Sequence, residues 1–207
     1  MTKRNVFSRK QRIYLPFKRF CDICISFFLI LLFIPFFFII SIIVLFDTGA
    51  FPVFRQKRIG KNNKEFLILK FRSMNKNAPR EVPTDQFVNP DKYISRFGKF
   101  IRKTSIDELP QLFNVFLGQM SFIGPRPALW NQKDLIEKRV EYNLHLIRPG
   151  LSGWAQCNGR DKVTTSQKVE LDKEYLTKLS LLFDIKIFFM SIWKALIRKD
   201  VVEGKQS

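Results

Sequence analysis

An uncharged and strongly apolar run extends from Ile23 to Phe46, and it constrains this chain more than any other feature. As an α-helix the run would be about 36 Å long, which is enough to cross the hydrocarbon core of a bilayer. It is longer than the apolar region of a cleaved signal peptide, and no small-residue cleavage site follows it. The sequence therefore predicts a helix that enters a membrane.

Pro35 lies near the middle of this run. A proline inside a helix removes one backbone N–H, clashes with the carbonyl four residues earlier and disfavours helical angles in the residue before it, so we expect a kink. Basic residues crowd both flanks, residues 3–19 and residues 55–64, and positively charged flanks tend to stay on the cytoplasmic side. A helix that breaks at Pro35 and leaves through the leaflet it entered satisfies both observations. An ordinary kinked transmembrane helix remains the alternative.

The charge of the chain points to anionic partners. Its 36 Lys and Arg residues outnumber 18 Asp and Glu residues, for a net charge of +18, which suits acidic lipids, phosphorylated substrates or nucleic acid. The 23 phenylalanines, many of them in the first third of the chain, favour lipid, so we expect no nucleic acid.

Three cysteines and one histidine do not supply a zinc site. Cys21 and Cys24 have redox spacing but lack a strand-helix context, so two incidental thiols are the simpler interpretation.

The pattern changes to short strands and helices after residue 48. Two β-prone runs, Pro52–Arg58 and Glu65–Phe71, flank a turn-like stretch at residues 60–63 and predict a β-hairpin. Residues 75–90 contain three prolines and predict a loop. Helices are expected from spacing and stop signals around residues 93–101 and over residues 107–118, 128–146 and 166–178.

The C-terminal stretch, residues 179–199, carries its polar residues on one stripe of an otherwise apolar helix. It is suited to lie in the membrane interface, and a core helix of the domain is the alternative. We expect a mostly helical α+β fold: a basic segment (residues 1–19), a Pro-broken re-entrant membrane helix (residues 20–47) and a small catalytic domain (residues 48–207).

Two adjacent acids, Asp107 and Glu108, follow the cations Arg102 and Lys103. The spacing of Ser105 and Glu108 matches a capping box, and acids in a first helical turn suit the helix dipole. On spacing alone, a helix cap is the simpler interpretation.

Three later clusters change this balance, because each holds an arginine beside Pro or Gly: residues 124–127, 148–150 and 153–160. An arginine on a stiff turn suits bidentate phosphate recognition. Together with the acidic pair they indicate Mg²⁺-assisted chemistry on a phosphate.

The order of the motifs closely resembles the bacterial sugar transferase family, the small monotopic phosphoglycosyl transferases that initiate capsule or exopolysaccharide synthesis. The resemblance covers residues 18–199. The motifs that carry it are Gln56-x-Arg58-x-Gly60, Lys70-Phe-Arg72-Ser-Met74, Arg102-Lys-Thr-Ser-x-Asp107-Glu108-Leu-Pro-Gln-Leu112, Asn114-Val115, Met120-Ser121, Gly124-Pro-Arg-Pro127, Arg148-Pro-Gly150, Gly153-Trp-Ala-Gln156 and Asn158-Gly-Arg160.

This resemblance implies transfer of a sugar 1-phosphate from a UDP-sugar, with an N-acetylated hexose expected, to undecaprenyl phosphate, with release of UMP. It implies a covalent intermediate on Asp107 and a Mg²⁺ ion held by Glu108. The residues expected to bind substrate or phosphate are Lys70, Arg102, Arg126, Gln156 and Arg160. The catalytic domain would lie on the cytoplasmic face of the bacterial inner membrane, in contact with anionic inner-leaflet lipids, and a homodimer stays open.

Two positions depart from the family pattern. Ile34 precedes Pro35 where a serine is usual, and Gln119 stands where members commonly carry an acid before Met-Ser. A different class of function, a non-enzymatic basic module tethered to the membrane that binds acidic lipid or nucleic acid, also accounts for the charge. Such a module would need no acidic dyad.

Overall fold

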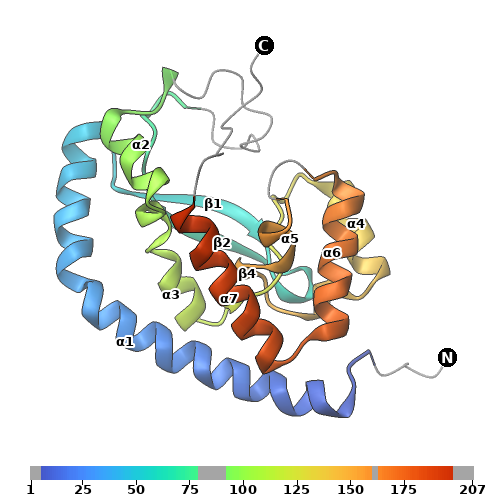
Figure 1. Ribbon diagram of the computed structural model, residues 1–207. Helices are drawn as coiled ribbons and strands as arrows, with labels where there is room; N and C mark the ends of the chain where they lie inside the picture. The colour runs from blue at the N-terminus through green and yellow to red at the C-terminus, as the bar shows by residue number, and fades with distance from the viewer. Residues whose placement is uncertain (1–5, 79–91, 160–162, 198–207) are drawn as a thin grey trace.

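A long N-terminal helix runs along one side of an α+β domain and turns up around its edge (Figure 1). The computed structural model describes residues 6–78, 92–159 and 163–197. The α-helices are α1 (Arg9–Thr48), α2 (Arg96–Lys103), α3 (Gln111–Phe116), α4 (Lys133–Glu141), α5 (Trp154–Cys157), α6 (Thr165–Lys178) and α7 (Leu181–Leu196). The strands are β1 (Val53–Ile59), β2 (Glu65–Phe71), β3 (Ser121–Ile123) and β4 (Gly150–Ser152), and short 3-10 turns are η1 (Lys61–Asn63), η4 (Ile106–Glu108) and η5 (Leu144–Leu146).

Helix α1 has well-defined ends. Ser8 begins it with a capping box that it shares with Gln11, and Gly49 ends it in the left-handed conformation (φ 61°). The helix begins at Arg9, so it includes much of the basic segment predicted over residues 1–19. It also continues through Pro35, so the expected break in the helix is wrong. Instead, α1 stays helical and bends around the domain (Figure 1). A proline inside a helix removes one backbone hydrogen bond, which permits a bend without ending the helix.

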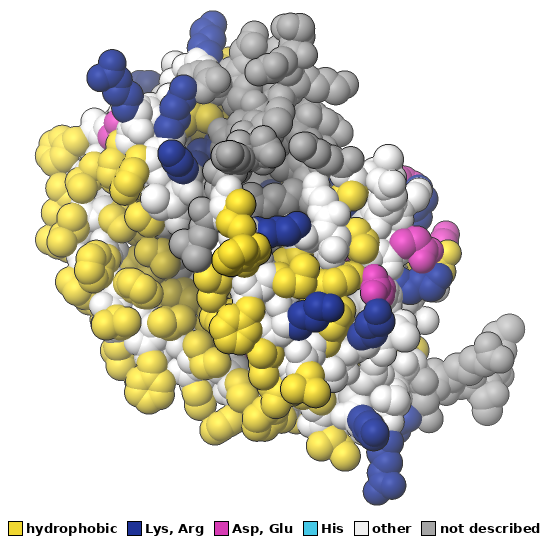
Figure 2. Space-filling view, in the orientation of Figure 1, with side chains coloured by type: hydrophobic (Ala, Val, Ile, Leu, Met, Phe, Trp, Pro, Cys, Tyr) yellow, Lys and Arg dark blue, Asp and Glu magenta, His cyan; other side chains and the backbone are white. Residues whose placement is uncertain are grey.

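Most side chains of α1 are exposed although they are apolar, and Phe38 and Phe46 are 69% and 83% exposed. By length and composition α1 is able to cross a membrane. Hydrophobic side chains cover the face formed by α1 and α7 (Figure 2). On α7 the exposed apolar side chains are Leu181, Leu182, Ile185, Phe188, Phe189, Ile192 and Trp193. A contiguous apolar surface of this extent marks a site that contacts lipid or another protein.

The predicted β-hairpin is confirmed: β1 and β2 pair antiparallel, with Phe54 opposite Lys70 and Arg58 opposite Phe66. Asn62 and Asn63 turn the chain with positive φ values of 57°, which asparagine tolerates better than most residues. The side chains of Phe66, Ile68 and Lys70 share one face of β2, since alternate residues of a strand point the same way. Phe66 and Ile68 pack on Val115 and Met120, so this face looks toward α3.

A second, parallel sheet of β3 and β4 joins segments far apart in the sequence and was not predicted. Here two glycines meet: a Cβ on Gly150 would lie 2.1 Å from Gly124 N. This close approach holds the turn of residues 124–127 against β4.

The structure shortens one predicted helix and bears out others. Residues 166–178 lie within α6 and residues 181–196 form α7, but the helix expected over residues 128–146 is limited to α4 and η5. The start is lost because Ala128 accepts a hydrogen bond from Ile59 N (2.9 Å), and the end because Asn143 is left-handed (φ 60°). Most of the predicted proline-rich loop, residues 79–90, lies outside the described residues.

The end of α1 packs against the acidic turn. Val44, Phe71 and Ile101 form a small core with Phe37, Ile40, Ile106 and Leu109 around it. Ile106 and Leu109 flank Asp107 and Glu108, so the second half of α1 supports the acidic pair directly. A larger core lies on the other side of the domain among α4, α6 and α7.

Candidate active site

Asp107 and Glu108 lie on the 3-10 turn η4, between α2 and α3. The capping-box interpretation of this turn is wrong. Ser105 has a left-handed backbone (φ 59°) and its side chain makes no capping hydrogen bond. The acids therefore do not serve as a cap, and the side chain of Glu108 is engaged elsewhere.

Cations from two other elements reach Glu108. Lys70 Nζ, on β2, lies 2.7 Å from Glu108 Oε1, and Arg126 Nη2 lies 3.7 Å from the same oxygen. Arg126 stands on the Gly-Pro-Arg-Pro turn and its side chain is about half exposed. The strand, the acidic turn and the proline-rich turn thus converge on Glu108.

Asp107 is set in an unusual environment for a carboxyl group. Its pKa is raised from 3.8 to about 6: burial is the main cause and Glu108 adds to it, while Lys70, Arg102 and Arg126 offset part of the rise. Lys70 and Arg126 contact Glu108 directly, and the charge of Arg102 also acts on Asp107. A pKa displaced by burial beside specific charges is characteristic of functional sites.

Arg58 is a fourth cation at this site, and the sequence did not single it out as a site residue. Its guanidinium donates to Pro127 O (3.1 Å) and Gln56 Oε1 (2.7 Å), while its Nε is buried without a partner. Burial and the charge of Arg126 lower its pKa, and Glu108 raises it. The motif Gln56-x-Arg58 was the available signal, because an alternating strand places Arg58 on the same face as Lys70.

A buried asparagine fixes the strand that carries Lys70. Asn114, 1% exposed, accepts from Leu69 N (3.0 Å) and donates to Leu67 O (2.8 Å) and to Gln119 Oε1 (2.6 Å). The side chain therefore locks β2 to α3 one residue from Lys70. Gln119, where an acid is usual, supplies the acceptor for this lock.

Two further residues expected at the site are Gln156 and Arg160. Gln156 lies on α5, where its Nε2 donates to Leu151 O (3.2 Å) and its Oε1 is buried without a partner. Its neighbour Gly153 touches Gly124, so Gln156 belongs to the support of the Gly-Pro-Arg-Pro turn. Arg160 lies outside the described residues.

The acidic pair could bind a Mg²⁺ ion that takes most of its other ligands from water and substrate, but it does not form a complete metal site by itself. Within the described residues no group of three His, Cys, Asp or Glu side chains is placed to hold a metal. Mg²⁺ commonly uses one or two carboxylates and takes its other ligands from water and substrate phosphates. Asp107 and Glu108 fit that pattern.

These features define a class: a small α+β domain with an acidic pair set among cations, joined to an apolar helix. Comparison of the sequence with protein-family models identifies the family: residues 13–198 match the model described as bacterial sugar transferase. The chain belongs to the bacterial sugar transferase family.

Named relatives agree with this assignment. The chain is 38% identical over 189 residues to the UDP-glucose:undecaprenyl-phosphate glucose-1-phosphate transferase of Escherichia coli, covering 88% of this chain and 40% of the relative. It is 39% identical over 186 residues to a UDP-N-acetylgalactosamine-undecaprenyl-phosphate N-acetylgalactosaminephosphotransferase of Aeromonas hydrophila, covering 87% and 44%. The exopolysaccharide production protein ExoY of Sinorhizobium fredii is 34% identical over 189 residues, covering 84% and 83%. The chain spans less than half the length of the first two relatives.

Proposed function

We propose that this protein transfers a sugar 1-phosphate from a UDP-sugar to undecaprenyl phosphate and releases UMP, as the first step of a capsule, exopolysaccharide or other glycan. The observation that carries the proposal is the partly buried acidic pair ringed by cations, with an Asp107 pKa of about 6. A carboxyl with this pKa is ionised at neutral pH, yet it is poorly solvated and so remains reactive.

The transfer proceeds in two displacements at Asp107. An oxygen of the Asp107 carboxylate attacks the phosphorus next to the sugar, the bond to the UMP oxygen breaks, and an aspartyl phosphosugar forms. The phosphate oxygen of undecaprenyl phosphate then attacks the same phosphorus and Asp107 leaves as a carboxylate. A covalent intermediate divides a difficult transfer into two easier ones.

The cations around the pair neutralise charge during both displacements. Lys70 and Arg126 already contact Glu108, and both can shift toward a diphosphate once it enters. Arg102, and Arg160 by its place in the motif, would hold further phosphate oxygens. A Mg²⁺ ion held by Glu108 would supply additional neutralisation of the diphosphate.

The membrane is the place where the two substrates meet. We infer that α1 enters the inner membrane from the cytoplasmic side and that its bend returns it to that side, with α7 in the interface. Support comes from the exposed apolar face of α1 and α7 and from the packing of Phe37, Ile40 and Val44 beside the acidic turn. A helix placed in this way holds Asp107 within reach of a lipid phosphate.

The direct test is UMP release from a panel of UDP-sugars with undecaprenyl phosphate and Mg²⁺. Asp107→Asn should lower the rate by at least about a thousandfold, because an amide is a far weaker nucleophile. Asp134→Asn, an exposed acid on α4, is the matched control and should keep the rate. Equal rates for Asp107→Asn and wild type would reject the nucleophile. The panel should begin with N-acetylated hexoses and include UDP-glucose, since relatives are named for both kinds of sugar.

Topology is tested separately in intact cells. Single cysteines at Thr2 and Gln206, in a variant without the native cysteines, should both be protected from a membrane-impermeant thiol reagent. Labelling at position 2 alone would show that α1 spans the membrane.

A further inference from the structure

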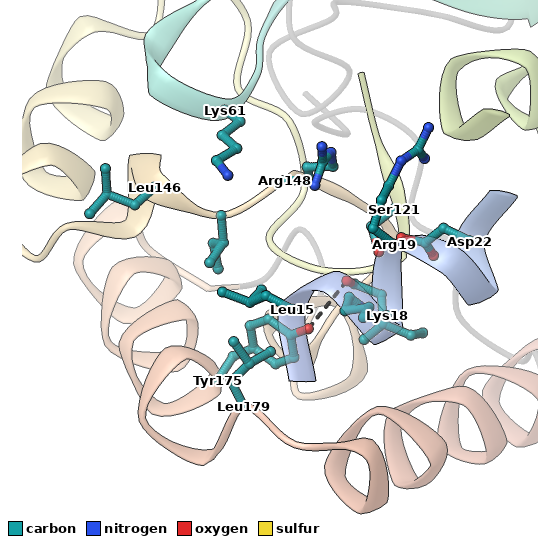
Figure 3. A pocket seen from close by; sticks show the side chains of 12 residues that line it. Leu15, Lys18, Arg19, Asp22, Lys61, Ser121, Leu146, Arg148, Tyr175 and Leu179 are labelled. Carbon is teal, nitrogen blue, oxygen red and sulfur yellow. Dashed lines mark hydrogen bonds between the residues drawn. The ribbon is translucent and has the colours of Figure 1, made fainter. Parts of the chain in front are cut away.

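A second cationic site lies behind the first part of α1 (Figure 3). It surrounds a cavity of about 40 Å³ between α1, the hairpin turn η1, β3 and η5. The polar side chains that line it are Lys18, Arg19, Asp22, Lys61, Ser121, Arg148 and Tyr175. None of the residues around the acidic pair lines this cavity, so it is a separate site.

Three of its four cations are not neutralised. Lys18 pairs with Asp184, which faces away into the domain. Arg19, Lys61 and Arg148 make no ion pair with any carboxylate in the part of the chain that the structure describes. Burial and the nearby Arg148 guanidinium lower the pKa of both Arg19 and Lys61, and Asp22 offsets part of this effect at Arg19.

Helix capping explains two of the cations but leaves one unexplained. Arg19 donates to Val115 O (2.6 Å) and Phe116 O (2.7 Å), and Arg148 Nε donates to Gly118 O (2.8 Å), so both satisfy carbonyls at the end of α3. Lys61 makes no such contact, and its amine points toward the cavity (Figure 3). The amine of Lys61 lies near Arg148 and has no ion-pair partner among the described residues, so an anion in the cavity would reduce the repulsion between these charges.

Two other polar groups in the cavity wall, Asp22 and Ser121, are compatible with a bound anion. Asp22 is the only carboxylate that lines the cavity among the described residues, and its Oδ1 already accepts the Phe122 N–H (3.1 Å). The buried Ser121 hydroxyl lies near Asp22 but has no hydrogen-bond partner of normal geometry. A phosphate oxygen in the cavity would accept from this hydroxyl and from the three cations.

The surroundings of the cavity are apolar, which favours a phosphate that carries a lipid. Arg19 is followed by Phe20, 64% exposed, and the carbonyls it contacts belong to the end of α3 beside Leu117, 67% exposed. The apolar run of α1 begins at Ile23, only a few residues away. A head group bound here would place its acyl chains along the exposed surface of α1 and α3.

We propose that this cavity binds the phosphate of an anionic membrane phospholipid through Lys61, Arg148, Arg19 and Ser121. The site is distinct from the proposed transfer site, although the inference rests on the proposed attachment of α1 to the membrane. A lipid held there anchors the domain at the start of the membrane helix. Phosphate chemistry is shared by lipid head groups and free phosphate, and the experiment separates the two.

The test measures binding of dioctanoyl phosphatidylglycerol to the full chain in an uncharged detergent by calorimetry. Lys61→Glu should weaken binding about tenfold or more, because it reverses one of the unpaired charges. Lys64→Glu makes the same change three residues along the same turn, at a residue that is exposed like Lys61 but does not line the cavity, and should leave the Kd within about twofold. Dioctanoyl phosphatidylcholine and inorganic phosphate should bind much more weakly than phosphatidylglycerol.

Three results would overturn the proposal: no binding of phosphatidylglycerol by wild type, equal weakening by Lys61→Glu and Lys64→Glu, or inorganic phosphate binding as tightly as the lipid. The last result would identify a free-anion site. Asp107→Asn should bind the lipid as wild type does, so failure of the transferase activity and failure of this site are read out independently.

Discussion

Lys70 Nζ lies 2.7 Å from Glu108 Oε1, so the β-hairpin and the acidic turn meet through an ion pair. Both side chains are partly screened from solvent, with 19% and 23% exposed. Asn114 holds the neighbouring residues Leu67 and Leu69, so Lys70 extends from a strand that cannot shift freely. The backbone of β2 therefore holds the positive charge of Lys70 in place next to Asp107.

Replacing Lys70 by methionine should move the pH dependence of transfer. Asp107 must be ionised to attack, so kcat/KM of wild type should rise with pH through about 6. Lys70 lowers the pKa of Asp107, so without its charge the pKa rises and the acidic limb moves to higher pH. A pH-rate profile of UMP release measures the shift apart from any loss of rate.

Lys57→Met provides the control on the same hairpin. Lys57 pairs with Glu65 on an exposed part of the hairpin and does not influence Asp107. Its acidic limb should match that of wild type. An unchanged limb in Lys70→Met would show that Lys70 does not set the ionisation of Asp107.

Asp107→Asn should stabilise the protein at neutral pH while it abolishes transfer. The pKa of Asp107 is about 6 when folded against 3.8 as an ordinary side chain, so its protonated form favours folding below about pH 4 and that contribution is lost as pH rises through about 6. An amide avoids the cost of burying the charge. We expect a gain of about 1–3 kcal/mol at pH 7.5 and about half of that gain at pH 5, from urea unfolding in detergent. A gain of the same size at both pH values would contradict the assignment of the pKa.

The Asn114–Gln119 pair should behave as a structural lock. Asn114→Leu removes three buried hydrogen bonds and leaves backbone groups of β2 unpaired, at a cost of about 2–4 kcal/mol of unfolding free energy. Gln119→Glu keeps an oxygen acceptor for Asn114 Nδ2, so stability and the Mg²⁺ dependence of transfer should stay close to wild type. A clear gain in Mg²⁺ affinity for Gln119→Glu would instead assign a metal-binding role to an acid at this position.

The sequence predicted the parts of this fold whose signals are local. The hairpin follows from alternating β-prone residues around an asparagine turn, and α6 begins at a capping box formed by Thr164 and Gln167. The acidic turn was harder, because Ser105 and Glu108 match a capping box that the left-handed backbone of Ser105 prevents. Only the later arginines favoured a site there.

What the sequence missed depends on contacts between distant segments. Strands β3 and β4 have three residues each, too few for a periodic pattern, and they form because Gly124 and Gly150 allow the backbones to meet. Residues 128–129 looked helical but pair with the end of β1, where Leu129 bridges Arg58. The same approach brings the guanidinium of Arg58 to Pro127 O, a contact between segments far apart in the sequence.

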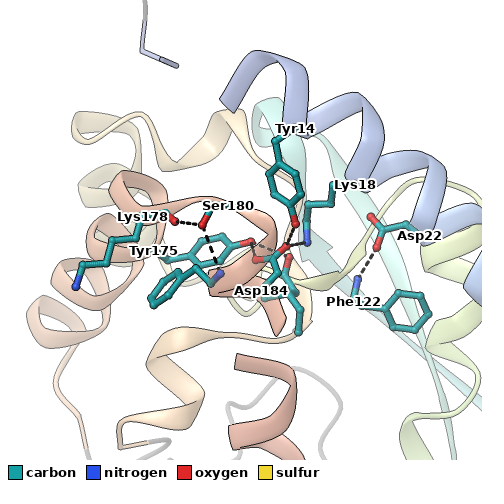
Figure 4. Close-up of polar contacts among 10 residues, drawn as sticks. Tyr14, Lys18, Asp22, Phe122, Tyr175, Lys178, Ser180 and Asp184 are labelled. Carbon is teal, nitrogen blue, oxygen red and sulfur yellow. Dashed lines mark hydrogen bonds and ion pairs between the residues drawn. The ribbon is translucent and has the colours of Figure 1, made fainter. Parts of the chain in front are cut away.

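The attachment of α1 to the domain should depend on a buried carboxylate. Asp184 on α7 accepts hydrogen bonds from Tyr14 (2.6 Å) and Tyr175 (2.8 Å) and pairs with Lys18 (Figure 4). Burial and Asp184 raise the pKa of both tyrosines, so each remains a hydrogen-bond donor. One carboxylate thus connects α1, α6 and α7.

Asp184→Leu should cost about 3–5 kcal/mol of unfolding free energy in urea titrations, because it leaves the amine of Lys18 buried without its partner. Adding Lys18→Met should recover a substantial part of that loss, since the unpaired charge is then gone. Asp134→Leu removes the partner of Lys138 at an exposed site, and it should cost less than about 1 kcal/mol. If Asp184→Leu is as mild as Asp134→Leu, or if Lys18→Met restores nothing, the ion pair does not hold α1. The apolar packing of Tyr14 and Leu15 on the core of α4, α6 and α7 would then account for the attachment.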